Sequence, residues 1–318
     1  MIYKEFEDCT LCPRGCRVNR YKKTGYCGQG AEVKAARAAL HFWEEPCISG
    51  KNGSGAVFFT GCQMRCVFCQ NTKIAAGQDG FPVSESRLSE IFLELQEKKA
   101  NNINLVTPTH FVPVIIRAVE AARNQGLKIP IVYNTSAYEE VDTVKSLEGI
   151  VNVWLPDYKY ASSVLAAKYS KAPDYPERAL AAIREMVRQA GTGILPSASH
   201  AHFATASEAA ALGIEEGIMT RGVIVRHLVL PGAVRESKDA LRRLYDNFEN
   251  RIFISIMNQY TPVAGLALPD ELTRKVAEDE YDRVLSYANA LGIENGFMQE
   301  GETQKESFIP EFTGEGIL

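Results

Sequence analysis

Residues 56–69 read AVFFTGCQMRCVFC and join a short apolar run to a loop with three cysteines. The run AVFFT is short and rich in β-branched and aromatic residues, as a buried strand is, and Gly61 allows a sharp turn after it. Cys62, Cys66 and Cys69 have the spacing C-x3-C-x2-C. Thiolates bind iron in clusters, and a four-iron cluster takes four ligands, so one iron would stay open here. The stretch predicts a strand that leads into a 4Fe-4S site.

Two other interpretations of these cysteines stay open, a zinc knuckle and a set of buried thiols without metal. Structural zinc takes four ligands, and no fourth cysteine follows Cys69, which favours the iron–sulfur interpretation. Phe68 stands directly before Cys69, where it would form an apolar wall beside the cluster, although aromatic residues more often simply pack in the core. Phe68 is therefore included among the predicted cofactor-binding residues.

Short apolar runs alternate with amphipathic segments from residue 55 onward, which predicts βα units and a parallel sheet. Since a full eight-unit barrel takes about 250 residues, the roughly 200 residues available here fit fewer units. The fold class is therefore predicted as α/β, an incomplete parallel (β/α)6 barrel with a small N-terminal cysteine-rich metal-binding appendage. The predicted strands cover residues 55–60, 102–107, 130–134, 150–156, 223–230 and 251–257. Helices are expected after a cap at Ser84 and over residues 111–124, 139–147, 175–189, 238–248 and 270–290.

The chain has 318 residues, of which 46% are hydrophobic and 23% charged, enough for one main domain and a smaller appendage. We predict a metal-binding region at 1–53 and a partial barrel with a C-terminal extension at 54–318. Residues 191–221 fit neither the strand nor the helix period and predict an irregular insertion. Its two histidines, His200 and His202, are expected in solvent rather than on a metal.

The charge and hydropathy of the chain limit the kinds of partner that it can bind. A net charge of -4 and the absence of a long Lys or Arg run argue against nucleic acid. The N-terminus lacks the apolar region of a signal peptide, and no stretch approaches the roughly 18 apolar residues of a membrane span. We therefore expect a cytoplasmic protein with no membrane partner.

Polar side chains follow the predicted strands, at the end where parallel barrels place their active sites. Arg226 interrupts the apolar strand 223–230, and a charge there is costly unless it meets an anion. Asp157 and Lys159 share one face of an extended chain, so they would pair with each other or with a ligand. Turn and capping roles explain single Thr or Asn residues equally well. The predicted cofactor-binding residues at these strand ends are Thr107, Thr109, Asn134, Asp157, Lys159 and Arg226.

The cysteine motif resembles that of the radical S-adenosylmethionine superfamily. The stretches LVTPTHF, IVYNTSAYE, WLPDYKY, VRHLVLPG and ISIMNQYTP, in this order, resemble its pyruvate formate-lyase activating enzyme-like branch over nearly the whole chain. The resemblance implies that the open iron chelates S-adenosylmethionine, that reductive cleavage gives a 5′-deoxyadenosyl radical, and that Asp157, Lys159 and Arg226 contact or flank this cofactor. Residues 107–109 stand where the family has a glycine-rich stretch that contacts the cofactor's amino group.

A second cysteine group precedes the barrel. Cys9, Cys12, Cys16 and Cys27 lie within nineteen residues of sequence. Four thiolates so close can form a tetrahedral zinc site, which is the preferred interpretation; an auxiliary 4Fe-4S cluster and unmetallated thiols are the alternatives. Cys47 stands apart and is expected to be an ordinary buried thiol.

These features predict a radical S-adenosylmethionine enzyme that abstracts hydrogen from a substrate of unknown class, a small molecule, peptide or protein. One alternative is the activation of a glycyl radical enzyme, although familiar activators carry their extra cluster cysteines after the radical motif. The other is a noncatalytic iron–sulfur or zinc scaffold, or a redox sensor. The enzyme would need anaerobic conditions and an electron donor such as flavodoxin or ferredoxin.

Overall fold

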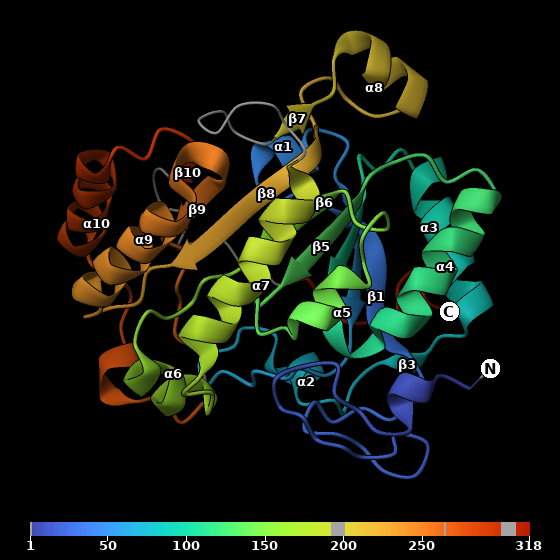
Figure 1. The fold of residues 1–318 in the computed structure, drawn as a ribbon, viewed down its shortest axis with the longest axis horizontal. Helices are drawn as coiled ribbons and strands as arrows, with labels where there is room; N and C mark the ends of the chain where they lie inside the picture. Colours follow the sequence, from blue (N-terminus) through green and yellow to red (C-terminus); the bar gives the residue numbers. More distant parts are fainter. Residues whose placement is uncertain (1, 192–200, 264, 300–309) are drawn as a thin grey trace.

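One large open sheet organises the computed structural model, which describes residues 2–191, 201–263, 265–299 and 310–318 (Figure 1). The strand order is β10-β9-β8-β6-β5-β4-β2-β1-β3, and all neighbours from β10 to β2 are parallel. No pairing among the described residues joins β3 to β10, so the barrel stays open. The parallel strands are β2 (Ser54–Phe59), β4 (Ile103–Val106), β5 (Ile131–Thr135), β6 (Val153–Pro156), β8 (Met219–Leu228), β9 (Phe253–Met257) and β10 (Gly296–Met298). The antiparallel strands are β1 (Lys34–His41), β3 (Phe81–Pro82) and β7 (His202–Phe203).

Helices follow most of the parallel strands and cover the outer face of the sheet (Figure 1). In α3 (Glu85–Glu97), Leu88, Ile91 and Phe92 recur at helical spacing and are buried, and the Ser84 side chain caps the helix by accepting from the Arg87 N–H. The other long helices are α4 (Val112–Asn124), α7 (Tyr175–Ala190), α9 (Val234–Phe248) and α10 (Glu278–Leu291). The shorter ones are α1 (Pro46–Ser49), α2 (Thr72–Ala75), α5 (Val141–Lys145), α6 (Ser163–Ser170) and α8 (Ala206–Leu212), with 3-10 turns at Lys4–Phe6, Thr109–Phe111, Glu249–Arg251 and Asp270–Leu272.

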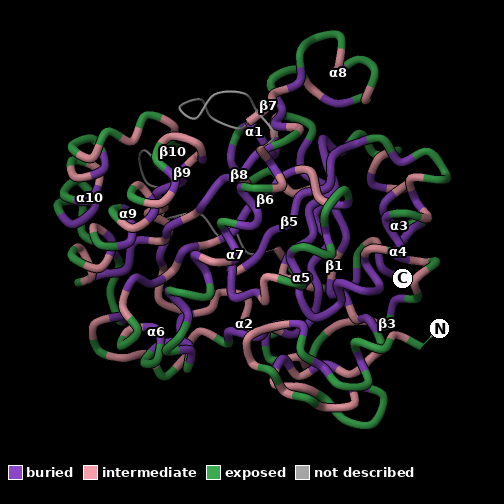
Figure 2. Tube along the Cα trace, in the orientation of Figure 1, coloured by how far each residue is buried: buried purple, intermediate pink, exposed green. Residues whose placement is uncertain are grey.

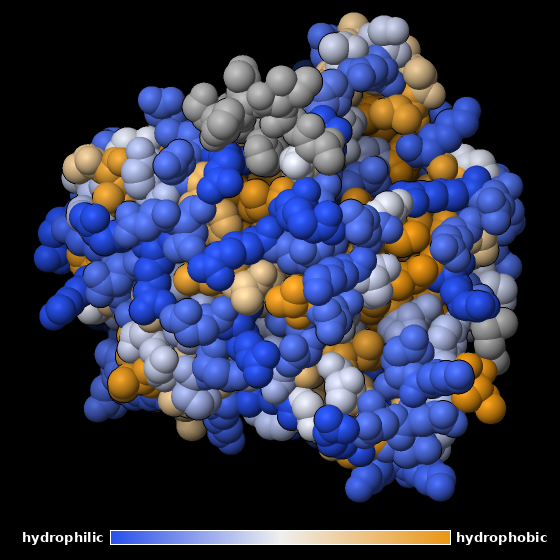
Figure 3. Space-filling view, viewed as in Figure 1, coloured by the Kyte–Doolittle hydropathy of each residue, from blue (hydrophilic) through white to orange (hydrophobic). Residues whose placement is uncertain are grey.

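Buried residues follow the strands and the inward sides of these helices (Figure 2). The surface seen in Figure 3 is mostly hydrophilic, as expected of outer helices that turn their apolar stripes to the sheet. A smaller apolar cluster lies on the inner face, where Cys47 and Ile48 of α1 pack with Val132, Val153 and Ile224. The short helix α1 therefore fills the inside of the barrel at the level of the strands' amino-terminal halves, and it confirms Cys47 as a buried thiol.

The predicted incomplete parallel barrel is confirmed, and each of the six predicted strands overlaps a parallel strand of the structure. The cap at Ser84 is also confirmed. The seventh parallel strand, β10, was missed because its three residues are too few for a periodic pattern. The predicted boundary at residues 53 and 54 stays a prediction, while β1 pairs antiparallel with β2 and so extends the main sheet towards the N-terminus.

Two predicted segments differ from the structure. The single helix expected over 270–290 is a 3-10 turn at Asp270–Leu272 followed, after a break, by α10. The insertion expected to be irregular, residues 191–221, contains a helix and the start of a strand. The helix α8 begins with a capping box between Thr205 and Glu208, and β8 starts at Met219. His202 bonds Glu208 at 2.9 Å and remains partly exposed, whereas His200 lies outside the described residues.

Candidate functional site

The cysteine loop leaves the sheet at the carboxyl end of β2, every residue of which is buried. Gly61 makes the turn with φ of +92°. A Cβ on Gly61 would lie 2.5 Å from Gln29 Cγ and 2.7 Å from the Cys27 carbonyl oxygen. Only glycine fits this conformation and this space, so the strand-to-loop turn expected from the sequence has a steric cause.

The three loop cysteines Cys62, Cys66 and Cys69 line one cavity of about 420 Å³. Burial raises the pKa of the Cys62 thiol, with Cys66 adding to the shift, and burial raises that of Cys69 to about 12. The Ser170 hydroxyl donates to Cys66 Sγ at 3.0 Å. Buried thiols of this kind stay protonated until a soft metal replaces the proton, so this donor set fits an iron–sulfur cluster.

Charged side chains from two strand ends line the same cavity. Lys159 Nζ donates to Asp157 Oδ2 at 2.6 Å, so the pairing between these two residues is found in the structure. Burial alone would raise the pKa of Asp157, but the positive charges of Lys159 and Arg226 outweigh it and the pKa is lowered. For Lys159 the Asp157 carboxylate likewise outweighs the effect of burial, and the pKa is raised. Both groups therefore stay charged at neutral pH.

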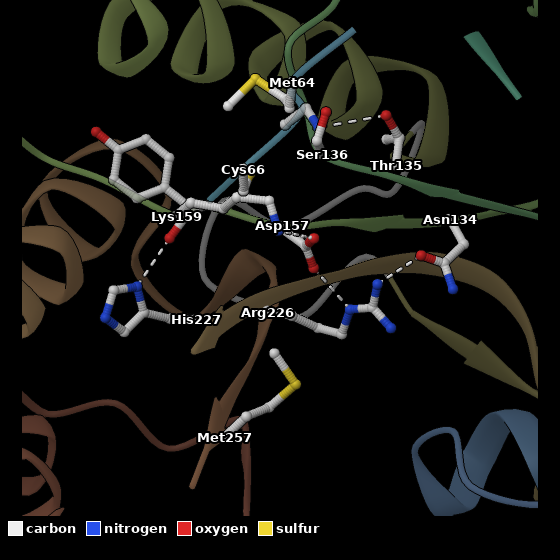
Figure 4. Close-up of polar contacts among 12 residues, drawn as sticks. Met64, Cys66, Asn134, Thr135, Ser136, Asp157, Lys159, Arg226, His227 and Met257 are labelled. Atoms are coloured by element: carbon white, nitrogen blue, oxygen red, sulfur yellow. Dashed lines mark hydrogen bonds and ion pairs between the residues drawn. The ribbon is translucent and has the colours of Figure 1, made fainter. Parts of the chain in front are cut away.

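Arg226 stands at the centre of this polar layer (Figure 4). Its Nε donates to Asp157 Oδ1 at 2.9 Å, its Nη1 donates to Glu44 Oε2 at 3.0 Å, and its Nη2 donates to Asn134 Oδ1 at 2.5 Å. The sequence predicted that Arg226 would meet an anion. In the structure the chain itself supplies two anions, the carboxylates of Glu44 and Asp157. A role towards a cofactor carboxylate stays a prediction and would use the remaining guanidinium N–H groups.

Two glutamates that the sequence did not single out face this layer. Glu44 and Glu45 end the segment between β1 and α1 and line the cavity. Glu44 Oε1 accepts from Asn104 Nδ2 at 3.0 Å and from Asn134 Nδ2 at 3.1 Å. The sequence EEP before a four-residue helix resembles an exposed helix start, so no local signal indicated that both side chains would point inward.

The structure brings most of the predicted cofactor-binding residues to the cavity but leaves two away from its walls. Thr107, Asn134, Asp157, Lys159 and Arg226 line it. Thr109 is buried behind it and donates to Glu139 Oε1 at 2.6 Å. Phe68 packs edge-on against the rings of Tyr160, Tyr169 and Tyr260, in the core beside the loop. Direct contact of Thr109 or Phe68 with a ligand in this cavity would need a rearrangement.

A buried polar network lies behind the loop. Gln63 Nε2 donates to the Thr109 hydroxyl at 2.8 Å, and the hydroxyls of Thr109 and Thr135 both donate to Glu139 Oε1. Burial raises the pKa of the Glu139 carboxyl to about 7, although the hydroxyls lower it in part. Glu139 Oε2 and the nearby Tyr133 hydroxyl have no hydrogen-bond partner among the described residues. The network thus ties the cysteine loop to β5 through a carboxyl group that titrates near neutrality.

The N-terminal cysteines Cys9, Cys12, Cys16 and Cys27 gather beneath the loop. A Cβ on Gly25 would lie 3.7 Å from both Cys16 Sγ and Cys27 Sγ. Burial raises the pKa of Cys12 and of Cys27. Within the described residues, however, no group of three or more His, Cys, Asp or Glu side chains has the arrangement of a single-ion site. Zinc or an auxiliary cluster at these cysteines therefore stays a prediction.

The two cysteine groups are direct neighbours. The Cys62 N–H donates to the Cys27 carbonyl oxygen at 3.3 Å. Arg14 Nε donates to the Gln63 carbonyl oxygen and Arg14 Nη2 to that of Ser170, both at 2.8 Å. The N-terminal region is therefore bonded directly to the backbone of the loop that carries the predicted cluster ligands.

Three further residues at strand ends do not line the cavity: Tyr158, His227 and Tyr260. The His227 ring pairs with the Tyr158 carbonyl oxygen at 2.8 Å, and the Tyr260 hydroxyl donates to the Leu272 carbonyl oxygen at 2.6 Å. All three side chains are buried in the core.

Comparison with known proteins supports an iron–sulfur protein. Residues 48–165, which include all three loop cysteines, match the family model described as 4Fe-4S single cluster domain. The uncharacterized protein MJ0674 of Methanocaldococcus jannaschii is 23% identical over 302 residues, which cover 91% of this chain and 76% of that protein. Among the described residues, no helix is long and apolar enough to cross a membrane.

Solved structures give weaker likenesses. Streptococcus suis SuiB bound to S-adenosylmethionine matches with a TM-score of 0.48 at 12% identity, over 76% of this chain and 49% of SuiB, so the chain spans about half of that protein. Methylornithine synthase (PylB) matches with 0.44 at 14% identity, over 74% of this chain and 63% of that one. A domain of pyruvate-formate lyase-activating enzyme from Bacteroides vulgatus matches with 0.37 at 12% identity, over 61% of this chain and 91% of that one. At these TM-scores and identities the likenesses carry no further conclusion about this chain.

The chain forms an open parallel α/β barrel, and the loop that carries Cys62, Cys66 and Cys69 lies within the part that matches the 4Fe-4S single cluster domain. The motifs that follow its strands resemble those of the radical S-adenosylmethionine superfamily and its pyruvate formate-lyase activating enzyme-like branch.

Proposed function

We propose that the chain is a radical S-adenosylmethionine enzyme, in which the thiolates of Cys62, Cys66 and Cys69 hold a 4Fe-4S cluster and the adjoining cavity receives S-adenosylmethionine and a substrate. One observation carries the proposal: the three cysteines after β2 and the Asp157–Lys159 pair after β6 line one cavity at the carboxyl edge of a parallel sheet. Active sites of parallel barrels form at this edge. When bound, the cluster supplies the electron for reductive cleavage of S-adenosylmethionine.

The chain's own residues position the ligands and exclude water. Lys159 and the unused N–H groups of Arg226 are the cationic donors of the cavity, suited to a carboxylate. Asn134 and Thr107 add neutral hydrogen-bonding groups in the same wall. The apolar side chains of Met64, Val106 and Met257 line the remaining wall and would exclude water from a reactive radical.

Within this class, hydrogen abstraction from a small molecule, peptide or protein is the proposed reaction, in the cytoplasm and with reduced flavodoxin or ferredoxin as the proposed electron donor. The activation of a glycyl radical enzyme is the alternative suggested by the motifs. A noncatalytic scaffold or redox sensor is the alternative from another class, and it would not need charged donors inside a cavity beside the cluster ligands.

The test is anaerobic reconstitution with iron and sulfide, followed by dithionite and S-adenosylmethionine, with 5′-deoxyadenosine and methionine measured. We expect both products from the wild type. The control is the triple variant in which Cys62, Cys66 and Cys69 are alanine, which should bind less iron and form no 5′-deoxyadenosine. An intact wild-type cluster that yields no 5′-deoxyadenosine would contradict the proposed enzyme and favour the scaffold.

A further inference from the structure

The cavity has a carboxyl group that forms no ion pair with any cation of the described residues. Its charged lining consists of the carboxylates of Glu44, Glu45 and Asp157 and the cations Lys159 and Arg226, three against two. Asp157 pairs with both cations, and Glu44 pairs with Arg226. Glu45 is the remaining acidic group and forms no ion pair within the described residues.

Glu45 is also left without a full set of hydrogen bonds. Only 9% of its surface is exposed, and its Oε2 has no partner among the described residues. Ser255, on the neighbouring wall of the cavity, lies near Glu45, and hydrogen bonding by its hydroxyl acts to lower the pKa of this carboxyl. A buried, unpaired carboxylate oxygen is costly, because desolvation is not repaid by a donor. Burial accordingly raises the pKa of Glu45, although the nearby Arg226 opposes the shift.

The position of Glu45 separates it from the predicted cluster ligands. Glu45 precedes α1, which packs on the inner face near the amino-terminal halves of the strands, while the cysteine loop follows the carboxyl end of β2. The polar layer of Asn134, Asp157 and Arg226 (Figure 4) is level with Ser255, which pairs with Arg226 in the sheet. Glu45 therefore lies near Arg226 and Ser255 on the side of the cavity where α1 packs, which we call its floor.

We propose that Glu45 binds a cationic nitrogen of the substrate, a protonated primary amine or a guanidinium, at the floor of this cavity. This inference names a substrate class for the proposed function and rests on it. An N–H cation satisfies the free Oε2, balances the extra carboxylate and still has a donor for the Ser255 hydroxyl. A metal ion is the poorer occupant, because among the described residues around Glu45 no group of three or more His, Cys, Asp or Glu side chains is placed to hold a single ion.

The test uses n-hexylamine as the probe and 1-hexanol as its neutral analogue, each titrated into the anaerobically reconstituted protein with S-adenosylmethionine present. Ligand-induced shifts of the unfolding midpoint give the dissociation constants. We expect the wild type to prefer the amine, and Glu45→Gln to weaken amine binding at least tenfold while leaving 1-hexanol unchanged. Glu97→Gln removes an exposed carboxylate from α3 and is the matched control, expected to bind like the wild type.

Folding is checked by iron content and circular dichroism, and Glu45→Asp serves as a second variant that retains the charge and should retain a preference for the amine. A wild type that binds both probes equally, or a Glu45→Gln variant that binds the amine as tightly as the wild type, would overturn the inference. Cleavage of S-adenosylmethionine by the wild type and by Glu97→Gln reports the proposed function separately. Intact cleavage without amine preference refutes only the role of Glu45.

Discussion

The carboxyl group of Glu139 should make the stability of this protein fall as the pH rises towards neutrality. Its pKa is about 7 in the folded chain, against an ordinary value of 4.5, because it is buried behind the cysteine loop. Between these two pH values the folded chain keeps a proton that the unfolded chain has already released. Stability is therefore highest below the unfolded pKa, decreases through this window, and levels off above the folded pKa.

The size of the effect follows from the shift. The rise of the Glu139 pKa from 4.5 to about 7 corresponds to about 3 kcal/mol in total, of which about 2.5 kcal/mol falls between roughly pH 5 and pH 8. The variant Glu139→Gln imitates the protonated form: its amide oxygen can accept from Thr109 and Thr135, and its NH₂ can face the Tyr133 hydroxyl. For a chain of this length, 2.5 kcal/mol corresponds to a difference of about 4 °C in Tm.

The assay is the Tm of the wild type and of Glu139→Gln under anaerobic conditions, at matched iron content, from roughly pH 5 to pH 8. We expect the variant to gain about 4 °C relative to the wild type across this range. The exposed Glu97→Gln should show no comparable gain. A Tm difference between wild type and Glu139→Gln that does not change with pH would refute the raised pKa of Glu139.

Two further substitutions test the loop and the polar layer. Arg226→Met leaves the Glu44 and Asp157 carboxylates without their shared cation, so we expect a loss of about 3–5 kcal/mol in urea unfolding; a loss below about 1 kcal/mol would mean that water replaces the guanidinium. Gly61→Ala places a methyl group 2.7 Å from the Cys27 carbonyl oxygen at φ of +92°. It should lower iron retention at least severalfold, and unchanged iron content would show that the turn is not strained.

The sequence was sufficient for the sheet because its strands are buried on both faces. Such strands read as continuous apolar runs, and β2, β4 and β5 are buried at every residue. The apolar pattern does not reveal a strand that is very short or that consists mainly of small residues. The antiparallel β1 was not expected, since its small residues Ala35, Ala36, Ala38 and Ala39 carry little strand signal even though all of them are buried.

Site residues that directly follow a strand could be predicted from the sequence. Site residues that reach the cavity from a segment distant in sequence could not. Asp157 and Lys159 share one face by the alternation of a strand, so their approach to the cavity could be predicted. Glu44 and Glu45 reach the same cavity only because α1 packs against the inner face of strands that come more than eighty residues later in sequence. No local pattern encodes such a contact. Thr109 lies away from the cavity wall, where its hydroxyl donates to Glu139.

The contacts of Arg226 indicate which cation of the cavity is available to an anionic ligand. The sequence assigned a cofactor carboxylate to this guanidinium, but two protein carboxylates and an amide oxygen already accept from it. Lys159 has three N–H donors, of which one is engaged within the described residues, by Asp157. Because Lys159 also lies close enough to Cys66 and Cys69 to interact with them electrostatically, it is the cation placed nearer to the predicted cluster. An anionic group beside that cluster would therefore meet Lys159 first, whereas the guanidinium of Arg226 is already paired with the carboxylates of Glu44 and Asp157.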